Sequence, residues 1–252
     1  MNADVFLTAL DLPSASRVDQ RVPKKLLLEN GAPTASDKRN INEGIDELLW
    51  LAALKPTTVG IPEYRDDARE YLEIAVLRLT LRADAKATRL IELVHRAVPY
   101  PVFLLAEQNE EPGLSLAHKR WSQGEVGKTV LDGQMVSVEW DATRDAANSS
   151  AFCQALGLGR QPRTTLYGLY QGWIDTVLAL HAARRSSAFV VAISADEAAA
   201  RREALQECEH FEAEIGRLRA AGAKEKQISR QVEINLELKR FEANLALAKG
   251  RL

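Results

Sequence analysis

The stretch DAKATRLIELVHRAVPYPVFLLAE, residues 84–107, predicts a helix followed directly by a strand. Asp84 can cap the free amides of a helix, and apolar residues then recur at helical spacing in one stripe: Leu90, Leu93, Val94, Ala97 and Val98. Pro99 and Pro101 end this helix, because proline has no amide hydrogen to donate. The apolar run 101–107 follows directly. We expect the helix to cover one face of a sheet.

Strands are predicted on both sides of this helix. Apolar residues alternate with polar ones, or run continuously, over 57–61, 71–81, 101–107, 114–121 and 135–140. The order of strand, strand, helix and three strands indicates a small mixed sheet. The last three strands follow one another closely, so we expect them to pair as antiparallel hairpins.

The residues before this sheet are interpreted as a helical lead-in. Over 37–54, Ile41, Ile45, Leu48, Leu49 and Ala52 recur at helical spacing, and Pro56 follows. The run VPKKLLLEN, 22–30, is either a strand or a turn of helix before a loop at Asn30 and Gly31.

Helices dominate the chain after residue 145. A short helix is predicted over 146–157 and a long one over 164–185, both packing on the sheet, whereas 188–193 is a strand, a buried link or the start of the next helix. The expected fold class is therefore α+β, with four segments: 1–56, 57–145, 146–193 and 195–252.

The final segment, 195–252, predicts an antiparallel helical hairpin of the coiled-coil kind, with a turn at 220–223. Its apolar residues recur every three or four positions, and Asn235, close to this seam, can fix the register. The first stripe contains Leu205, Cys208, Phe211, Ile215 and Leu218, and the second contains Ile228, Val232, Ile234, Leu238, Phe241 and Leu245. A hairpin of this kind is either an arm of the protein itself or an arm that also holds a partner.

Composition excludes several function classes. The 252 residues carry 33 basic and 35 acidic side chains, so no global field attracts nucleic acid or an anionic membrane. Cys153 and Cys208 are far apart, and no segment approaches the length of a membrane span. We expect a cytoplasmic protein without a cofactor.

The segment WSQGEVGKT, 121–129, ends like a phosphate-binding loop. Such a loop needs a glycine five residues before Gly127, where this chain has Ser122, and it needs a helix after Thr129, where the pattern predicts a strand. We therefore interpret Gly124, Gly127 and Gly133 as turn residues between two strands.

No catalytic or metal-binding pattern is complete in the sequence. His95, His118, His181 and His210 each stand alone, without a second ligand at metal-binding spacing. A restriction-type nuclease would place a lysine two residues after an acid such as Glu73, but Ala75 stands there. A divergent metal-dependent nuclease that uses Asp66, Asp67 and Glu73 stays open as an alternative.

The run LAHKRW, 116–121, is a candidate nucleic-acid contact. His118, Lys119, Arg120 and Trp121 would place cations beside an aromatic ring if this strand end is exposed. The competing interpretation is a strand that leaves the core and enters solvent. A stand-alone DNA-binding module is thus a further alternative, and it requires salt-sensitive binding by the isolated chain.

Four stretches together resemble the bacterial domain-of-unknown-function family 4391. They are VPKKLLLE, HRAVPYPVFLL, LAHKRWSQ and KEKQISRQVEINLELKRFEANL, and the resemblance runs from about residue 21 to 247. Proteins of that family look like companions encoded near helicases, DNA methyltransferases and restriction-like genes, which implies a role in defence against foreign DNA. The resemblance supplies no catalytic residue. It singles out these positions for testing: Pro23, Lys24, Lys25, Pro99, Tyr100, Pro101, His118, Lys119, Arg120, Gln227, Arg230, Gln231, Glu233, Asn235 and Lys239.

The resulting hypothesis is a non-catalytic accessory subunit of an anti-phage defence complex that contains a helicase. Its hairpin would dock on the partner through Gln227, Arg230, Gln231, Glu233, Asn235 and Lys239. Nucleic acid would be contacted through Lys24, Lys25, His118, Lys119, Arg120 and Trp121.

Overall fold

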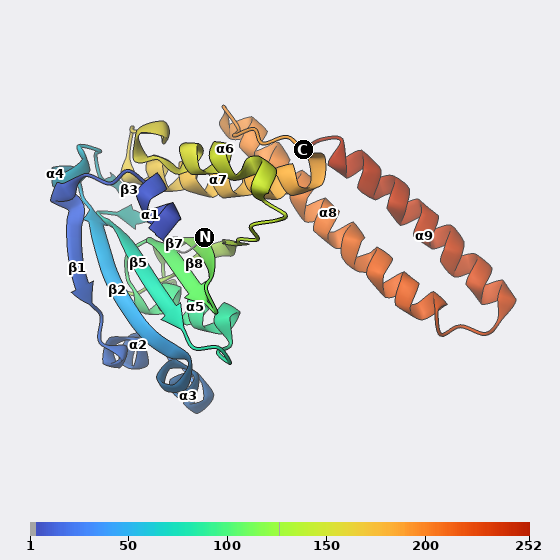
Figure 1. Ribbon diagram of the computed structural model, residues 1–252, viewed down its shortest axis with the longest axis horizontal. Coiled ribbons are helices and arrows are strands. Elements are labelled where there is room, and N and C mark those ends of the chain that lie inside the picture. Colours follow the sequence, from blue (N-terminus) through green and yellow to red (C-terminus); the bar gives the residue numbers. More distant parts are fainter. Residues whose placement is uncertain (1–3, 126) are drawn as a thin grey trace. The chain divides into compact units, whose positions relative to one another are not determined.

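The structure, a computed structural model, describes residues 4–125 and 127–252 and confirms the α+β class (Figure 1). It consists of two compact units, one that ends at Val177 and one that comprises Leu178–Leu252. The first unit contains a mixed six-stranded sheet, and the second contains the predicted pair of long helices. Within the described ranges, no helix has both the length and the apolar character needed to cross a membrane.

The N-terminal region contains two strands of the main sheet as well as helices. Its elements are α1 (Asp4–Ala9), β1 (Arg17–Arg21), α2 (Lys24–Asn30), α3 (Ala35–Gly44) and β2 (Ile45–Leu54), with a 3₁₀ turn at Ser14–Ser16. The prediction of one helix over 37–54 is therefore wrong after Gly44. The physical reason is that 51–54 form a continuous apolar run buried on both faces, which suits a central strand between two neighbours.

The main sheet has the strand order β1-β2-β5-β6-β7-β8. Its later strands are β5 (Ile74–Leu81), β6 (Val102–Gln108), β7 (Glu111–Trp121) and β8 (Thr129–Glu139). Only β5 and β6 are parallel, and α5 (Ala87–Ala97) connects them. The helix predicted after Asp84 and the antiparallel pairing of the last three strands are thus confirmed.

Two details between these strands differ from the sequence predictions. Residues 57–61, predicted as a strand, contain most of a short helix, α4 (Pro56–Val59), because Pro56 occupies its first turn and the Lys55 amide donates a hydrogen bond to the Thr58 hydroxyl. A small hairpin of β3 (Tyr64–Arg65) and β4 (Glu70–Tyr71) follows. The glycine-rich loop does join β7 to β8, but Gly133 lies inside β8, with φ +80°, beside a register shift.

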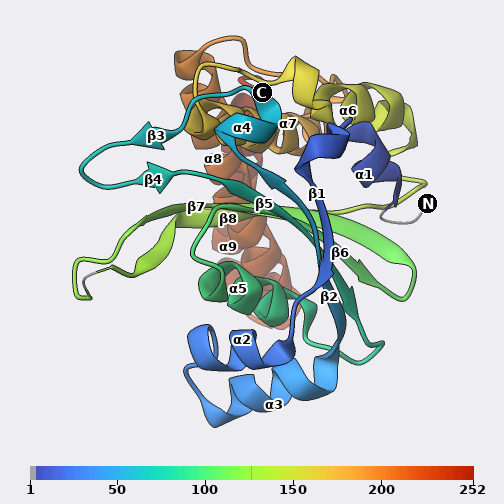
Figure 2. The ribbon, with the colours of Figure 1, turned by 90° about the vertical axis from the view of Figure 1, so that its left-hand side faces the viewer.

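Helices cover both faces of the sheet. Figure 2 shows α2, α3 and α5 together on one side and α1, α4 and α6 (Ser149–Leu156) on the other. The first group packs closely, since a Cβ at Gly31 would lie 2.7 Å from the Ala97 Cβ. On the opposite face, the first part of α7 (Leu166–Ser186) reaches the sheet, where the Tyr170 hydroxyl donates to the Val102 carbonyl at 2.7 Å. The predicted helices over 146–157 and 164–185 are confirmed, with 3₁₀ turns at Ala146–Asn148 and Leu158–Arg160.

The second unit is built on an antiparallel pair of helices, α8 (Ala195–Gly222) and α9 (Ile228–Lys249), seen side by side in Figure 1. Residues 188–193 before them form neither strand nor helix. The seam buries Cys208, Ile215 and Leu218 of α8, and Phe211 contacts Phe241 with ring centroids 6.0 Å apart. On α9 the seam residues recur at heptad spacing, and all are partly buried except Ala248, which is fully buried: Gln231, Ile234, Leu238, Phe241, Leu245 and Ala248.

One ion pair joins α3 to α5. The buried Asp37 carboxylate accepts two hydrogen bonds from Arg89, at 2.8 and 3.0 Å, and a third from the Thr34 hydroxyl at 2.7 Å. The Arg89 and Thr34 hydrogen bonds favour the ionised carboxylate and hold the pKa of Asp37 at about 2.

We expect Asp37→Asn to lower the stability of the protein at pH 5.5 and to have less effect as the pH approaches 2. Because the folded-state pKa lies below the ordinary value of 3.8, this carboxylate stabilises the fold above pH 3.8, and its contribution is lost as the pH falls through about 2. Urea unfolding across this pH range measures the difference between the two proteins. Asp46→Asn, an exposed carboxylate on β2, is the matched control; a pH-independent effect of Asp37→Asn would contradict this explanation.

Candidate functional site

Lys119 lies inside the protein rather than on a nucleic-acid surface. It is 1% exposed, and its Nζ donates hydrogen bonds to the carbonyls of His95 and Val98 at the C-terminal end of α5. These carbonyls have no partner within the helix, and a cation is favourable beside them. Burial nevertheless lowers the pKa of Lys119 to about 7. The predicted nucleic-acid contact at this residue is wrong, because its ammonium group is enclosed.

Lys24 has the same arrangement at a second helix. From the start of α2, its Nζ donates to the carbonyls of Asn42, at 3.3 Å, and Ile45, at the C-terminal end of α3. Desolvation is the main cause that lowers its pKa. Lys25, the next residue, is exposed and lies 3.7 Å from Glu29 on the same helix. Two of the three lysines proposed as nucleic-acid contacts therefore close the ends of helices.

His118 belongs to a chain of hydrogen bonds between β4, β7 and α7. The Tyr71 hydroxyl lies 2.5 Å from His118 Nδ1, His118 Nε2 lies 2.9 Å from Gln171 Oε1, and the Gln171 amide donates to Asp175 at 2.9 Å. Burial raises the pKa of Tyr71, so its hydroxyl keeps its proton. We infer that Tyr71 donates to Nδ1 and that the imidazole proton is on Nε2.

Aromatic rings stack beside this chain. Tyr167 lies between Tyr64 and His118, with centroid distances of 4.9 and 5.0 Å. The nearby arginines are paired with a carboxylate, since Arg69 lies 2.6 Å and Arg120 lies 3.7 Å from Asp132. The structure thus brings His118 and Arg120 to one side of β7 and Lys119 to the other. The surface has rings that can stack on a base, but both arginines already have carboxylate partners, since Asp66 also lies 3.7 Å from Arg69.

Trp121, the last residue of the candidate set, is partly buried at the end of β7. Its backbone amide donates to the Ala68 carbonyl at 2.7 Å, which ties β7 to the turn of the β3–β4 hairpin. The sequence offered no signal for the neighbours of His118, because Tyr64, Tyr71, Tyr167 and Gln171 come from three separate segments.

The acids of the nuclease alternative have separate partners. Asp66 accepts hydrogen bonds from the amides of Ala68 and Arg69 and from the Tyr64 hydroxyl, all within its own hairpin. Glu73 is buried and lies 3.1 Å from Lys55 Nζ. In the part of the chain that the structure describes, no group of three histidine, cysteine or acidic residues is placed to hold a metal ion.

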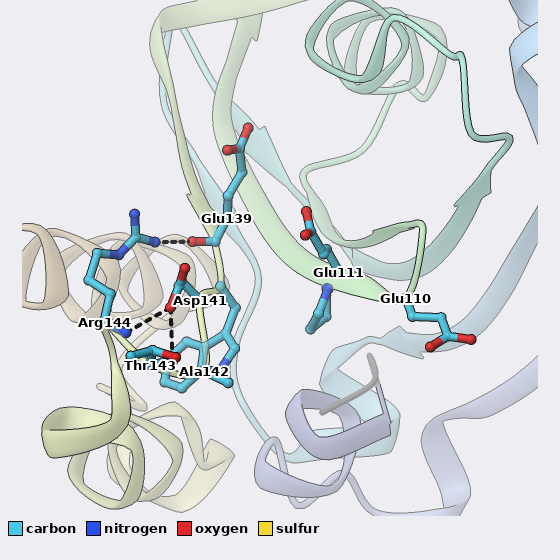
Figure 3. Close-up of a pocket in the computed structure, with 9 residues that line it drawn as sticks. Glu110, Glu111, Glu139, Asp141, Ala142, Thr143 and Arg144 are labelled. Atoms are coloured by element: carbon cyan, nitrogen blue, oxygen red, sulfur yellow. Dashed lines mark hydrogen bonds between the residues drawn. The ribbon is translucent and has the colours of Figure 1, made fainter.

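An acid-rich pocket of about 350 Å³ lies where β7 and β8 meet the loop after β8 (Figure 3). Asp141 accepts hydrogen bonds from the backbone amides of Thr143 and Arg144, at 2.8 and 2.7 Å, and Arg144 Nη2 donates to the Glu139 carbonyl at 2.7 Å. In Figure 3 the carboxylates of Glu110, Glu111 and Glu139 do not converge on one point. The contacts explain the fold of the loop rather than a ligand site.

A second pocket, mainly apolar and about 380 Å³ in volume, brings two of the family-like segments together. Val22, Pro23 and Leu26 line it from the VPKKLLLE segment, and Pro99 and Tyr100 line it from the HRAVPYP segment. Lys24, on α2, donates to the end of α3, and Lys119 donates to the end of α5, so each lysine fixes a helix beside this pocket. Two segments that resemble the family are therefore neighbours in the fold.

The outer side of α9 is apolar and exposed. Ile228, Val232, Leu236 and Leu247 are 78, 52, 64 and 72% exposed. Together with the exposed Ala243 they form one stripe on the side of the helix that faces away from the seam with α8. We call this set the outer stripe. Ile228 and Val232 were predicted on the seam, which is wrong, because both are exposed and heptad spacing from Ile234 places the partly buried Gln231 there instead.

The predicted docking residues are distributed around this stripe. Lys239 lies within it, and Glu233 and Asn235 flank it on exposed positions. Asn235 is thus not a seam residue. Gln231 donates to the Glu225 carbonyl at 2.6 Å, and Arg230 lies 3.9 Å from the Glu225 carboxylate, so these two contact the α8–α9 turn. Gln227 precedes α9 and is exposed. Leu236 and Leu247 were missed, although their spacing from Val232 and Ala243 is a signal of a second apolar face.

The fold and this surface define an α+β protein with a mixed sheet and a helical hairpin that is apolar on two sides. The chain belongs to the family of the domain of unknown function DUF4391, whose family model matches residues 10–245. This confirms the resemblance seen in the sequence. No curated protein and no solved structure matches the chain.

We expect Lys119→Met to destabilise the protein more at pH 10 than at pH 7. At pH 10 the variant should lose about 1–3 kcal/mol, because carbonyls at the end of α5 are left without a donor. The unfolded chain binds a proton at this lysine up to its ordinary pKa of 10.5, whereas the folded protein releases it near 7, so the wild-type protein gains stability between these values. Urea unfolding at both pH values tests this, and an equal loss at both would contradict it.

Proposed function

We propose that this protein is a non-catalytic accessory subunit that docks onto a partner protein through the outer stripe of α9. The observation that carries the proposal is the exposure of Ile228, Val232, Leu236 and Leu247 on one side of a helix whose opposite side already packs in the seam. Single exposed apolar residues are common on protein surfaces, but a row of them along a helix is typical of an interaction site.

Burial of this surface contributes favourable free energy to association. Full burial of one valine, leucine or isoleucine side chain contributes about 1.5–3 kcal/mol. Four such residues offset part of the entropy lost on binding, and the flanking polar residues then add specificity. The outer stripe therefore supports a moderate affinity that a larger interface would increase.

Family membership supports the choice of partner. The resemblance associates such proteins with helicase and methyltransferase genes, and on that basis we propose a helicase-containing anti-phage defence complex as the assembly. Direct contact with nucleic acid is not required in this proposal. Lys24 and Lys119, two of the cations first considered for it, already donate to helix carbonyls.

The test is a pull-down of the tagged full-length protein from cells that express its genomic neighbours. We expect a helicase or methyltransferase to co-purify in stoichiometric amount with the wild-type chain and to be reduced about tenfold or more with the triple variant Ile228→Ser, Val232→Ser and Leu236→Ser. Mass spectrometry identifies the bound protein, and circular dichroism confirms that the variant is folded.

The matched control is Glu237→Ala with Asn244→Ala, two exposed polar residues on an adjacent side of α9. Co-purification that survives the triple variant, or that is lost equally in the control, would remove the outer stripe as the docking surface. Isolation of the wild-type chain without any partner would overturn the proposed function itself.

A further inference from the structure

Lys239 interrupts the outer stripe between Leu236 and Ala243. It is exposed, and it lies one helical turn from each of them on the same side of α9. Among residues 4–125 and 127–252 it has no ion-pair partner, and the same holds for its neighbour Arg240. A partner that covers the stripe must therefore also accommodate an uncompensated cation near its middle.

We propose that the partner segment is an amphipathic α-helix whose apolar face carries a carboxylate opposite Lys239. This inference rests on the proposed function, since it assigns the chemistry of the segment that covers the outer stripe.

The shape of the stripe favours a helix as the occupant. From Ile228 to Leu247 it runs about 29 Å along α9, at 1.5 Å per residue, and it is one helix face wide. The backbone of α9 is hydrogen bonded within the helix, so it offers no free edge to an extended strand. A helix laid along the stripe can insert its side chains between those of α9, as α8 does on the other side.

Charge determines what this helix must carry. Burying the Lys239 ammonium against apolar atoms costs several kcal/mol, and a carboxylate at hydrogen-bond distance offsets that cost. An acid opposite Lys239 also fixes the register of the partner along the stripe, because a shift by one turn separates the charges.

The same charge disfavours a second copy of this chain as the occupant. In a parallel symmetric pair, Lys239 faces Lys239 of the other copy. In an antiparallel pair with Ile228 opposite Leu247, the two lysines are offset by only three residues, about 4.5 Å along the axis. Both arrangements bring two ammonium groups together, and like charges at such positions are destabilising.

The experiment compares substitutions of Lys239 in the full-length chain, with the dissociation constant of the co-purified partner complex as the readout. We expect Lys239→Met to weaken binding about threefold to tenfold and Lys239→Glu to weaken it more, while Lys239→Arg keeps it within about twofold. Lys224→Glu, the same charge change in the α8–α9 turn, is the matched control and should have little effect.

The methionine variant decides between an acidic and a purely apolar partner face. If the facing surface has no carboxylate, Lys239→Met extends the outer stripe and tightens binding, which would overturn the inference while docking through α9 still holds. Charge exchange completes the test, since replacing the facing acid by lysine should restore binding to Lys239→Glu.

Concentration-dependent dimerisation of the purified chain, seen by sedimentation equilibrium and lost in the triple variant, would instead make a second copy the occupant. If no partner co-purifies at all, the proposed function and this inference both fail.

Discussion

The contact between Lys119 and the end of α5 is the constraint on which the sheet unit depends. The helix connects the two parallel strands β5 and β6, and of its C-terminal carbonyls that of His95 is buried and that of Val98 is partly buried. A lysine from β7, the next strand, supplies the missing donors to His95 and Val98. Burying an ammonium group is costly, and the lowered pKa of Lys119 records that cost. Two otherwise orphaned carbonyls and the negative end of the helix dipole offset it.

Lys24 makes the same kind of contact at the end of α3. The two lysines therefore give the family-like segments a structural role, where the sequence suggested nucleic-acid binding. A cation beside aromatic residues in a sequence is consistent with nucleic-acid binding, and a lysine can also donate to the last carbonyls of a helix. The chemistry is the same in both cases, because an ammonium group binds a carbonyl or a phosphate oxygen through the same hydrogens. Burial separates the two roles, and burial is a property of the tertiary structure. In this protein burial assigns Lys119 to the fold. Lys24 is only partly buried, and its hydrogen bonds to the end of α3 are what give it a structural role.

Within the hairpin, α9 has one side whose role is readable from the sequence and another side whose role depends on exposure. Heptad spacing from Ile234 to Ala248 is readable directly, and it predicts the seam with α8. Val232 lies one position after the seam residue Gln231, a displacement of about 100° around the helix axis, and Ile228 lies one turn before Val232 on the same side. That rotation moves two apolar side chains from the seam to the outside. It turns a stabilising feature of one chain into a surface that a second protein can cover.

The sequence by itself determined the α+β class, the α5 helix, the antiparallel order of β6 to β8 and the hairpin, because each is recorded in local periodicity and in proline or glycine positions. It did not distinguish helix from strand over 45–54, since the apolar run there satisfies both patterns and only pairing with β1 and β5 selects the strand. It also did not predict the aromatic rings that stack around His118, because they come from distant segments of the chain. The tertiary structure alone decided which lysines are enclosed and which apolar residues of α9 remain uncovered. These are questions of accessible surface, and accessible surface exists only once every other segment has taken its place.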